Sequence, residues 1–250
     1  MVHSMTVAGS SVADKSQRRL RPRDAATLVL VDRSGTEPRV LMGRRRDDLL
    51  FMPGLYVFPG GRVDASDRTA PACDVLCPGD EARLLVEMKG RASARRARAL
   101  ALAAIREAFE ETGVIIGHRV ENISAPATDP WYPFLATGHL PRLGVLTLLA
   151  RAITPPGRPR RFDTRFFVAD ASDVAGRRDH LDGELSSVGW FTFGEMRALD
   201  LPRITRVVVE DLADFLAEGG DPSRRRPVPF YFFRGGSFRR KLLSHVAGET

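Results

Sequence analysis

The sequence predicts a single α/β domain in which a mixed β-sheet is sandwiched between helices. The chain has 250 residues, enough for one sizeable domain with elaborations. Short apolar, β-branched runs recur between turn-forming residues, which is the pattern of strands. Two longer stretches, 93–112 and 204–220, have the spacing of helices instead. Together these observations favour a sheet with helices packed on it.

The N-terminal part is expected to form strands. Residues 26–33 (ATLVLVDR) and 39–45 (RVLMGRR) are separated by SGTEP, so we expect a hairpin. Residues 54–61 (GLYVFPGG) read as a short strand that runs into a Pro-Gly-Gly turn. Residues 64–92 are irregular, apart from one short helix expected at 80–89. We interpret this irregular stretch as a surface insertion.

The helix expected over 93–112 has recognisable ends. Ser93 is a plausible N-cap, and Gly113 supplies the C-terminal stop. A strand is expected to follow at 113–116. Further strands are expected at 143–154, 161–169, 187–193 and 227–233, and the second amphipathic helix at 204–220. The prolines of the last strand exclude a central position, so we expect it at an edge of the sheet.

The ends of the chain read as tails. We expect a disordered or loosely held tail at 1–24, a domain at 25–235 and a C-terminal tail at 236–250. No run approaches the roughly 20 apolar residues that a membrane span needs, and the N-terminus lacks an apolar signal core. We therefore expect a cytoplasmic protein with no membrane partner. The oligomeric state stays open, a homodimer included.

The charge balance bears on the class of partner. The net charge of +7 comes almost wholly from arginines that are spread along the chain. They form no basic patch interleaved with aromatic residues, so we expect no nucleic-acid partner. A small molecule that carries phosphates fits the basic balance better. Cys73 and Cys77 have no second pair to complete a zinc site, so we assign them no metal.

A cluster of carboxylates lies near the end of the first helix. Glu107, Glu110 and Glu111 are spaced i, i+3 and i+4, so they fall on one helical face, opposite the apolar residues. The helix dipole disfavours negative charge at this end. Arg106 and solvent would offset that cost, as would a divalent cation, since Mg²⁺ and Mn²⁺ prefer oxygen ligands.

The run from Arg106 to Val114 resembles the signature of the Nudix hydrolase family. That signature is Gly-x5-Glu-x7-Arg-Glu-U-x-Glu-Glu-x-Gly-U, where U is a bulky apolar residue. Its second half is complete here, except that the small Ala108 occupies the first U position. The first half begins at FPGG, with Gly61 as the signature glycine and Asp67 where the family has glutamate.

The spacing between the two halves departs from the family pattern. The family places the arginine 14 positions after the glycine, whereas Gly61 and Arg106 are 45 positions apart. The sequence therefore carries an insertion of 31 residues, expected at about 65–97. Such an insertion costs little, because loop-closure entropy grows slowly with length. Whether it forms part of a substrate lid or only decorates the surface is open, as is the role of Asp67.

The resemblance implies a Nudix-type fold and a metal-dependent diphosphatase. It implies that Glu107, Glu110 and Glu111 hold a catalytic Mg²⁺ or Mn²⁺ and that Arg106 orients these carboxylates. The turn at Gly60–Gly61 would shape the loop beside them. The expected substrate is a nucleoside diphosphate linked to another moiety. The identity of the general base is open.

Residues 40–61 resemble, in part, the coenzyme A diphosphatases of this family. Their pattern is Leu-Leu-Thr-x-Arg-Ser/Ala-x3-Arg-x3-Gly-x3-Phe-Pro-Gly-Gly; Leu41 and Arg45 match it in register, while Leu50 replaces its second arginine. The animal peroxisomal branch and its bacterial relatives share the motif FMPG-x-x-VFPGG-x-x-D and an RRFDTRFF strand, here at 160–167. This resemblance implies coenzyme A or acyl-CoA as the substrate.

Other interpretations remain beside this one. In one alternative, the substrate is ADP-ribose, a nucleotide sugar or a dinucleotide. In another, the chain is a non-catalytic nucleotide-binding regulatory module. Arg44, Arg45 and Arg46 are expected to grip phosphates, with solvated strand-end charges as the alternative. Glu184 is either a further metal ligand or base, or a surface residue.

Overall fold

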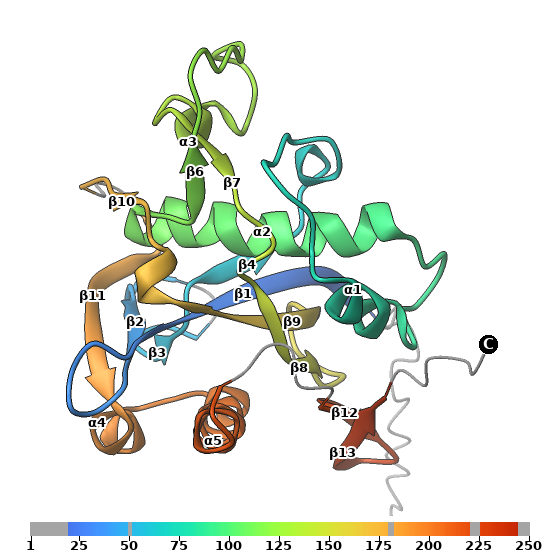
Figure 1. The fold of residues 1–250 in the computed structure, drawn as a ribbon. Helices are drawn as coiled ribbons and strands as arrows, with labels where there is room; N and C mark the ends of the chain where they lie inside the picture. Colours follow the sequence, from blue (N-terminus) through green and yellow to red (C-terminus); the bar gives the residue numbers. More distant parts are fainter. Residues whose placement is uncertain (1–19, 50–51, 180–182, 221–225, 245–250) are drawn as a thin grey trace, which may run out of the picture.

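The computed structural model describes residues 20–49, 52–179, 183–220 and 226–244 (Figure 1). Within them, the main sheet has nine strands in the order β11-β2-β1-β9-β8-β12-β13, with β3 paired to β2 and β4 paired to β1. These strands are β1 (Arg23–Asp32), β2 (Arg39–Arg45), β3 (Tyr56–Val57), β4 (Gly60–Arg62), β8 (Thr147–Ile153), β9 (Phe162–Asp170), β11 (Leu185–Thr192), β12 (Val228–Arg234) and β13 (Ser237–Leu243).

The helices and the smaller ladders complete the described part of the fold. The helices are α1 (Pro78–Leu85), α2 (Ala94–Thr112), α3 (Tyr132–Leu135), α4 (Phe193–Ala198) and α5 (Arg203–Ala217), with 3-10 turns η1 (Ser66–Arg68) and η2 (Ala171–Asp173). Two small ladders pair β5 (Val114–Ile115) with β10 (Gly176–Arg177), and β6 (Gly117–Arg119) with β7 (His139–Pro141). None of the helices in the described residues has the length and apolar composition needed to cross a membrane.

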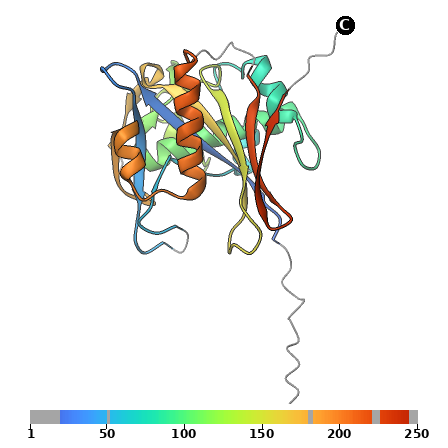
Figure 2. The same cartoon turned by 90° about the horizontal axis from the view of Figure 1, so that it is seen from below.

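The sheet is mixed and lies between helices. Strand β1 runs parallel to β9 and antiparallel to β2 and β4, while β8 runs antiparallel to β9 and parallel to β12. Helix α2 crosses one face of the sheet, and α4 and α5 lie against the other (Figures 1 and 2). This architecture confirms the predicted fold class.

Each face of the sheet has its own core, and β1 contributes to both. Leu28 and Leu30 pack in the core beneath α2, whereas Val29 and Val31 pack in the core beneath α4 and α5. The side chains of a strand alternate between its two faces, so a strand covered on both sides must be apolar throughout. This explains why the sequence of β1 is a continuous apolar run.

Helix α2 begins and ends where its sequence predicts. Ser93 caps it, since its Oγ accepts a hydrogen bond of 3.3 Å from the backbone N–H of Arg96. Gly113 ends it with a φ of 72°, a left-handed conformation that favours glycine. The hairpin β1–β2 is likewise confirmed. The strand expected at 113–116 is shorter, since β5 holds only Val114 and Ile115.

The C-terminal edge of the sheet differs from the prediction. Strand β12 is not an edge strand, because it lies between β8 and β13. Its residue Pro229 lies outside the register with β8, which pairs only Phe230 and Tyr231 of β12. Residues 237–243, expected to be part of a tail, form β13, which pairs with β12 along its whole length. The tail expected at 1–24 also differs, since β1 begins at Arg23; residues 1–19 lie outside the described residues.

The insertion packs on the side of α2. Its helix α1 spans Pro78–Leu85 rather than the expected 80–89, and it begins with proline at the first helical position. Arg98 Nη2 of α2 donates a hydrogen bond of 2.6 Å to the carbonyl of Ala70. The backbone N–H of Cys73 donates one of 3.0 Å to the carbonyl of Pro141. These bonds fix the insertion against neighbouring elements.

Candidate active site

A cavity of about 730 Å³ opens where β1 and β9 begin. Ala25 and Thr27 of β1 line it, together with Gly60 and Gly61, which follow the Phe-Pro turn and begin β4. The carboxylates of Glu107 and Glu111 reach it from α2, and Glu184 reaches it from the segment before β11. Antiparallel pairing holds the turn against β1, with Thr27 opposite Gly60 and Ala26 opposite Gly61. The cavity therefore joins the two halves of the Nudix-like signature.

Glu111 is buried beside the Gly60–Gly61 turn. The residue is only 6% exposed, and its Oε2 accepts a hydrogen bond of 2.9 Å from the backbone N–H of Gly60. Glu107 lies one helical turn earlier, and Arg106 Nη1 forms an ion pair of 3.0 Å with its Oε1. Gly61 lies so close that a Cβ there would collide with the Glu107 carboxylate. A side chain at position 61 would therefore displace this carboxylate from its place beside the turn.

The two helix carboxylates that line the cavity have raised pKa values. Burial raises the pKa of Glu107 to about 7, against the opposing effect of Arg106. Burial also raises the pKa of Glu111 to about 8; the Gly60 N–H opposes this rise, and the nearby carboxylates of Glu107 and Glu184 add to it. Desolvation disfavours a charged carboxylate unless a cation compensates it. Desolvated oxygen donors of this kind suit a hard divalent cation.

The structure does not bring Glu110 to the same place. Its side chain is 45% exposed, does not line the cavity, and accepts a hydrogen bond of 3.0 Å from Arg106 Nη1. Among the described residues, no group of three or more His, Cys, Asp or Glu side chains is arranged to hold a metal ion. The metal role of the three glutamates therefore stays a prediction, and of the three only Glu107 and Glu111 line the cavity.

Asp67 lies behind the site and holds Arg106. It is completely buried, and it accepts hydrogen bonds from Arg106 Nε at 2.9 Å and from Arg106 Nη2 at 3.1 Å. It also accepts from Trp131 Nε1 at 3.1 Å and from the backbone N–H of Asp64 at 2.7 Å. With four donors on two oxygens, this carboxylate has no room for a metal. Asp67 instead fixes the guanidinium that contacts Glu107 and Glu110.

The three consecutive arginines of β2 and the following turn have separate surroundings. Arg44 forms two hydrogen bonds with Asp47, of 2.8 and 3.2 Å, and it does not line the cavity. Arg46 forms two with Asp48, of 2.8 and 3.0 Å.

Arg45 does line the cavity, and its Nη2 donates a hydrogen bond of 2.8 Å to Glu184 Oε2. Glu184, which the sequence leaves as either a metal ligand or base or a surface residue, is therefore a wall residue of the cavity with a partly exposed side chain. Leu50, which replaces an arginine of the coenzyme A pattern, lies outside the described residues.

None of the residues that line the cavity comes from 64–92. The insertion therefore does not form part of the cavity wall.

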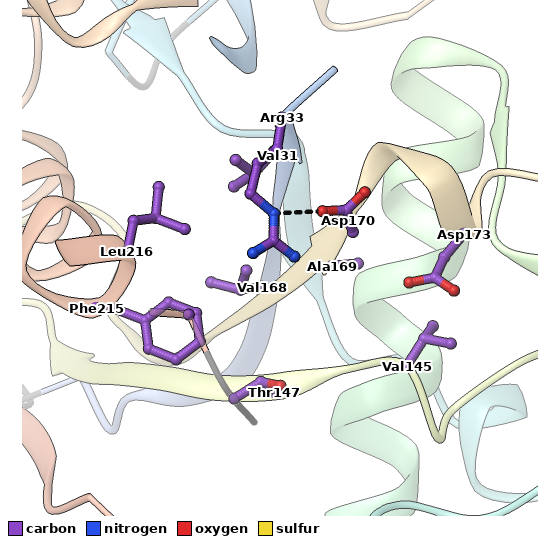
Figure 3. A pocket seen from close by; sticks show the side chains of 11 residues that line it. Val31, Arg33, Val145, Thr147, Val168, Ala169, Asp170, Asp173, Phe215 and Leu216 are labelled. Carbon is purple, nitrogen blue, oxygen red and sulfur yellow. Dashed lines mark hydrogen bonds and ion pairs between the residues drawn. The ribbon is translucent and has the colours of Figure 1, made fainter. Parts of the chain in front are cut away.

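A smaller cavity of about 90 Å³ lies at the opposite ends of β1 and β9. Figure 3 shows Arg33 and Asp170 joined across it by an ion pair of 2.6 Å, with Val31, Val168 and Phe215 around them. Both of its acidic residues, Asp170 and Asp173, form ion pairs with arginines, and neither belongs to the Nudix-like signature. The larger cavity is therefore the candidate active site.

Two comparisons with known proteins bear on the family. The chain is 29% identical over 178 residues to the Caenorhabditis elegans protein named "Putative nudix hydrolase 7". That alignment covers 67% of this chain and 50% of the relative, so the chain spans about half the length of the curated relative it matches. No protein-family model matches the chain.

A solved structure gives the second comparison. The crystal structure of a NUDIX hydrolase from Alicyclobacillus acidocaldarius superposes with a TM-score of 0.57 at 29% identity, and covers 76% of this chain and 90% of that one. The cavity also joins the glycine turn and the Arg106–Gly113 helix end in one place. The named relative and the structural neighbour together support the Nudix hydrolase family for this chain.

Proposed function

We propose that the protein is a metal-dependent Nudix diphosphatase that hydrolyses the diphosphate bond of coenzyme A or an acyl-CoA. The observation that carries this proposal is the pair formed by the buried Glu111 and the half-buried Glu107, set beside the Gly60–Gly61 turn at one end of a large cavity. A pair of carboxylates provides part of the coordination of Mg²⁺ or Mn²⁺, and substrate phosphates with water complete it. The residues present therefore fit such an ion.

The chain's own residues would prepare the site for the cation. Glu107 and Glu111 would lose their protons when the cation binds, because its charge outweighs the cost of desolvation. The Gly60 N–H fixes Oε2 of Glu111, and Arg106 fixes Oε1 of Glu107. Glu110 is a further predicted ligand, and its side chain would have to leave Arg106 to join the other two.

The reaction adds water across one phosphoanhydride bond. When bound, the cation would neutralise the diphosphate and favour ionisation of the attacking water. Arg45, whose side chain is 11% exposed, would contact the phosphate oxygens at the cavity wall. Glu184 lies beside Arg45 and would accept the proton of the water on its carboxylate. Arg44 is a predicted phosphate contact that stays outside this scheme, because Asp47 holds it.

The choice of coenzyme A rests on the resemblance of residues 40–61 and 160–167 to the coenzyme A diphosphatases. The apolar part of the cavity wall, which includes Met52, Phe58 and Ile204, would accommodate the uncharged parts of such a substrate.

A substrate panel tests the proposal. Coenzyme A, an acyl-CoA, ADP-ribose, NADH and UDP-glucose would be incubated separately with Mg²⁺ or Mn²⁺, and the products identified by mass. We expect coenzyme A to give adenosine 3′,5′-bisphosphate and a phosphopantetheine. Cleavage of ADP-ribose but not of coenzyme A would overturn the substrate. If no diphosphate is cleaved, the protein is a binding module rather than an enzyme.

A further inference from the structure

The two ends of the larger cavity differ in charge. All of the carboxylates that line it, those of Glu107, Glu111 and Glu184, belong to the signature end. The rest of the wall contains arginines but no further acidic residue in the described part of the chain. These arginines are Arg21, Arg23, Arg62, Arg160 and Arg161. A ligand that spans the cavity would therefore meet a cationic surface away from the carboxylate pair.

The sheet brings three of these arginines together. Strand β1 pairs in parallel with β9, so Arg23 lies opposite Phe162, next to Arg161. The backbone N–H of Arg23 donates a hydrogen bond of 2.9 Å to the carbonyl of Arg161. Arg160 directly precedes Arg161, in the connection between β8 and β9. The pairing thus brings residues that are 137 or more positions apart in the sequence to one edge of the cavity.

The same strand sets the distance between the two ends. Thr27 lies opposite Gly60, whose N–H holds Glu111, and Arg23 lies four residues earlier on the same face of β1. At the rise of an extended strand, four residues span ~13 Å. A flexible arginine side chain shortens the gap that a ligand must bridge. A nucleotide that carries two separate phosphate groups has dimensions of this order.

The arginines of this edge differ from those of β2 in their hydrogen-bond and ion-pair partners. Arg23 and Arg160 are exposed, and neither forms an ion pair within the described residues. Arg161 donates to two backbone carbonyls instead, from Nε to Thr154 at 3.0 Å and from Nη1 to Leu20 at 2.8 Å. Arg161 is thus held in place, while Arg23 and Arg160 beside it keep their donors for a ligand.

We propose that Arg23, Arg160 and Arg161 form a second anion subsite, which binds a phosphate monoester of the substrate remote from its diphosphate. The ligand class is a nucleotide derivative that carries such a phosphate in addition to its diphosphate. Planar guanidinium groups bind phosphate oxygens in pairs, which gives this subsite its selectivity for a phosphate over a hydroxyl. The orientation of the ligand rests on the proposed function, in which the carboxylate end takes the diphosphate.

The test is the equilibrium binding of two matched ligands, adenosine 3′,5′-bisphosphate and AMP, measured by calorimetry. Neither ligand contains a diphosphate, so the result does not depend on turnover. We expect the wild-type protein to bind the bisphosphate about tenfold more tightly than AMP, and R23Q and R160Q each to bring this ratio close to one. Arg158 lies in the same β8–β9 connection, is exposed and does not line the cavity, so R158Q is the matched charge control.

The alternatives give different ratios. Equal affinities of the wild-type protein for the two ligands, or no binding of the bisphosphate, would overturn the subsite. So would an equal effect of R158Q and R160Q, since that would reflect bulk charge rather than a contact. If the panel of diphosphates shows no turnover while the bisphosphate preference persists and depends on Arg160, the enzymatic proposal fails and the subsite stands.

Discussion

Asp67 shows how one buried side chain supports the site without reaching the cavity. Its two oxygens accept four hydrogen bonds, two of which come from the buried guanidinium of Arg106. Arg106 in turn contacts Glu107 and Glu110. Asp67, which stands where the family signature has glutamate, thus acts on the site only through Arg106.

The buried Arg106–Asp67 pair predicts a large loss of stability on substitution. Asp67→Asn leaves the charge of Arg106 buried without its main partner. Removing one member of such a pair lowers the free energy of unfolding by about 3–5 kcal/mol. Glu110→Gln is the matched control, since it removes the exposed partner of the same guanidinium and should cost about 1 kcal/mol or less. Urea denaturation of the two variants measures both free energies. Similar losses in the two would show that Asp67 does not anchor Arg106.

At the scale of elements, local signals predict α2 well and the sheet edge poorly. The cap at Ser93 and the stop at Gly113 depend on residues next to the helix, so the sequence reveals both. Most residues of β13 are polar or exposed, so its apolar pattern is weak. The signal that would have found it is the Gly235–Gly236 pair, whose φ values of 58° and 73° are those of a two-residue hairpin turn.

Asp80 in helix α1 should make the stability of the protein depend on pH. Asp80 is fully buried, and burial raises its pKa from 3.8 to about 6, against the effect of nearby Arg83. Between these values the folded protein binds a proton that the unfolded chain has lost. This carboxylate therefore lowers the free energy of unfolding as the pH rises from about 4 to about 6, by roughly 3 kcal/mol in all.

The comparison with Asp80→Asn isolates this effect, because the other carboxylates titrate in both proteins. The free energy of unfolding of the wild-type protein, minus that of the variant, should decrease between about pH 4 and about pH 6 and then stay constant. Urea titrations across this range measure the difference. Parallel pH profiles of the two proteins would mean that Asp80 titrates normally in the fold.

At the scale of the whole molecule, the cavity collects residues that no local pattern connects. The signature end could be predicted, since Gly60, Gly61 and the Glu107–Glu111 stretch belong to recognisable runs. The arginine edge could not, because Arg23 and Arg160 meet only through the parallel pairing of β1 with β9. Glu184 is a candidate from the sequence, but its place in the cavity depends on the pairing of β11 with β2, which brings it to Arg45. Long-range pairing of this kind leaves no signal in either segment alone.

The central claim is that Glu107 and Glu111 hold the divalent cation on which turnover depends. Mn²⁺ binding, followed by the electron paramagnetic resonance signal of the free ion near neutral pH, tests it most directly on the wild-type protein, E111Q and the exposed control E121Q. We expect wild type and E121Q to bind Mn²⁺ alike and to be active. We expect E111Q to stay folded, to bind Mn²⁺ at least about tenfold more weakly and to lose nearly all diphosphatase turnover. Unchanged Mn²⁺ affinity and near-normal turnover in E111Q would contradict the account.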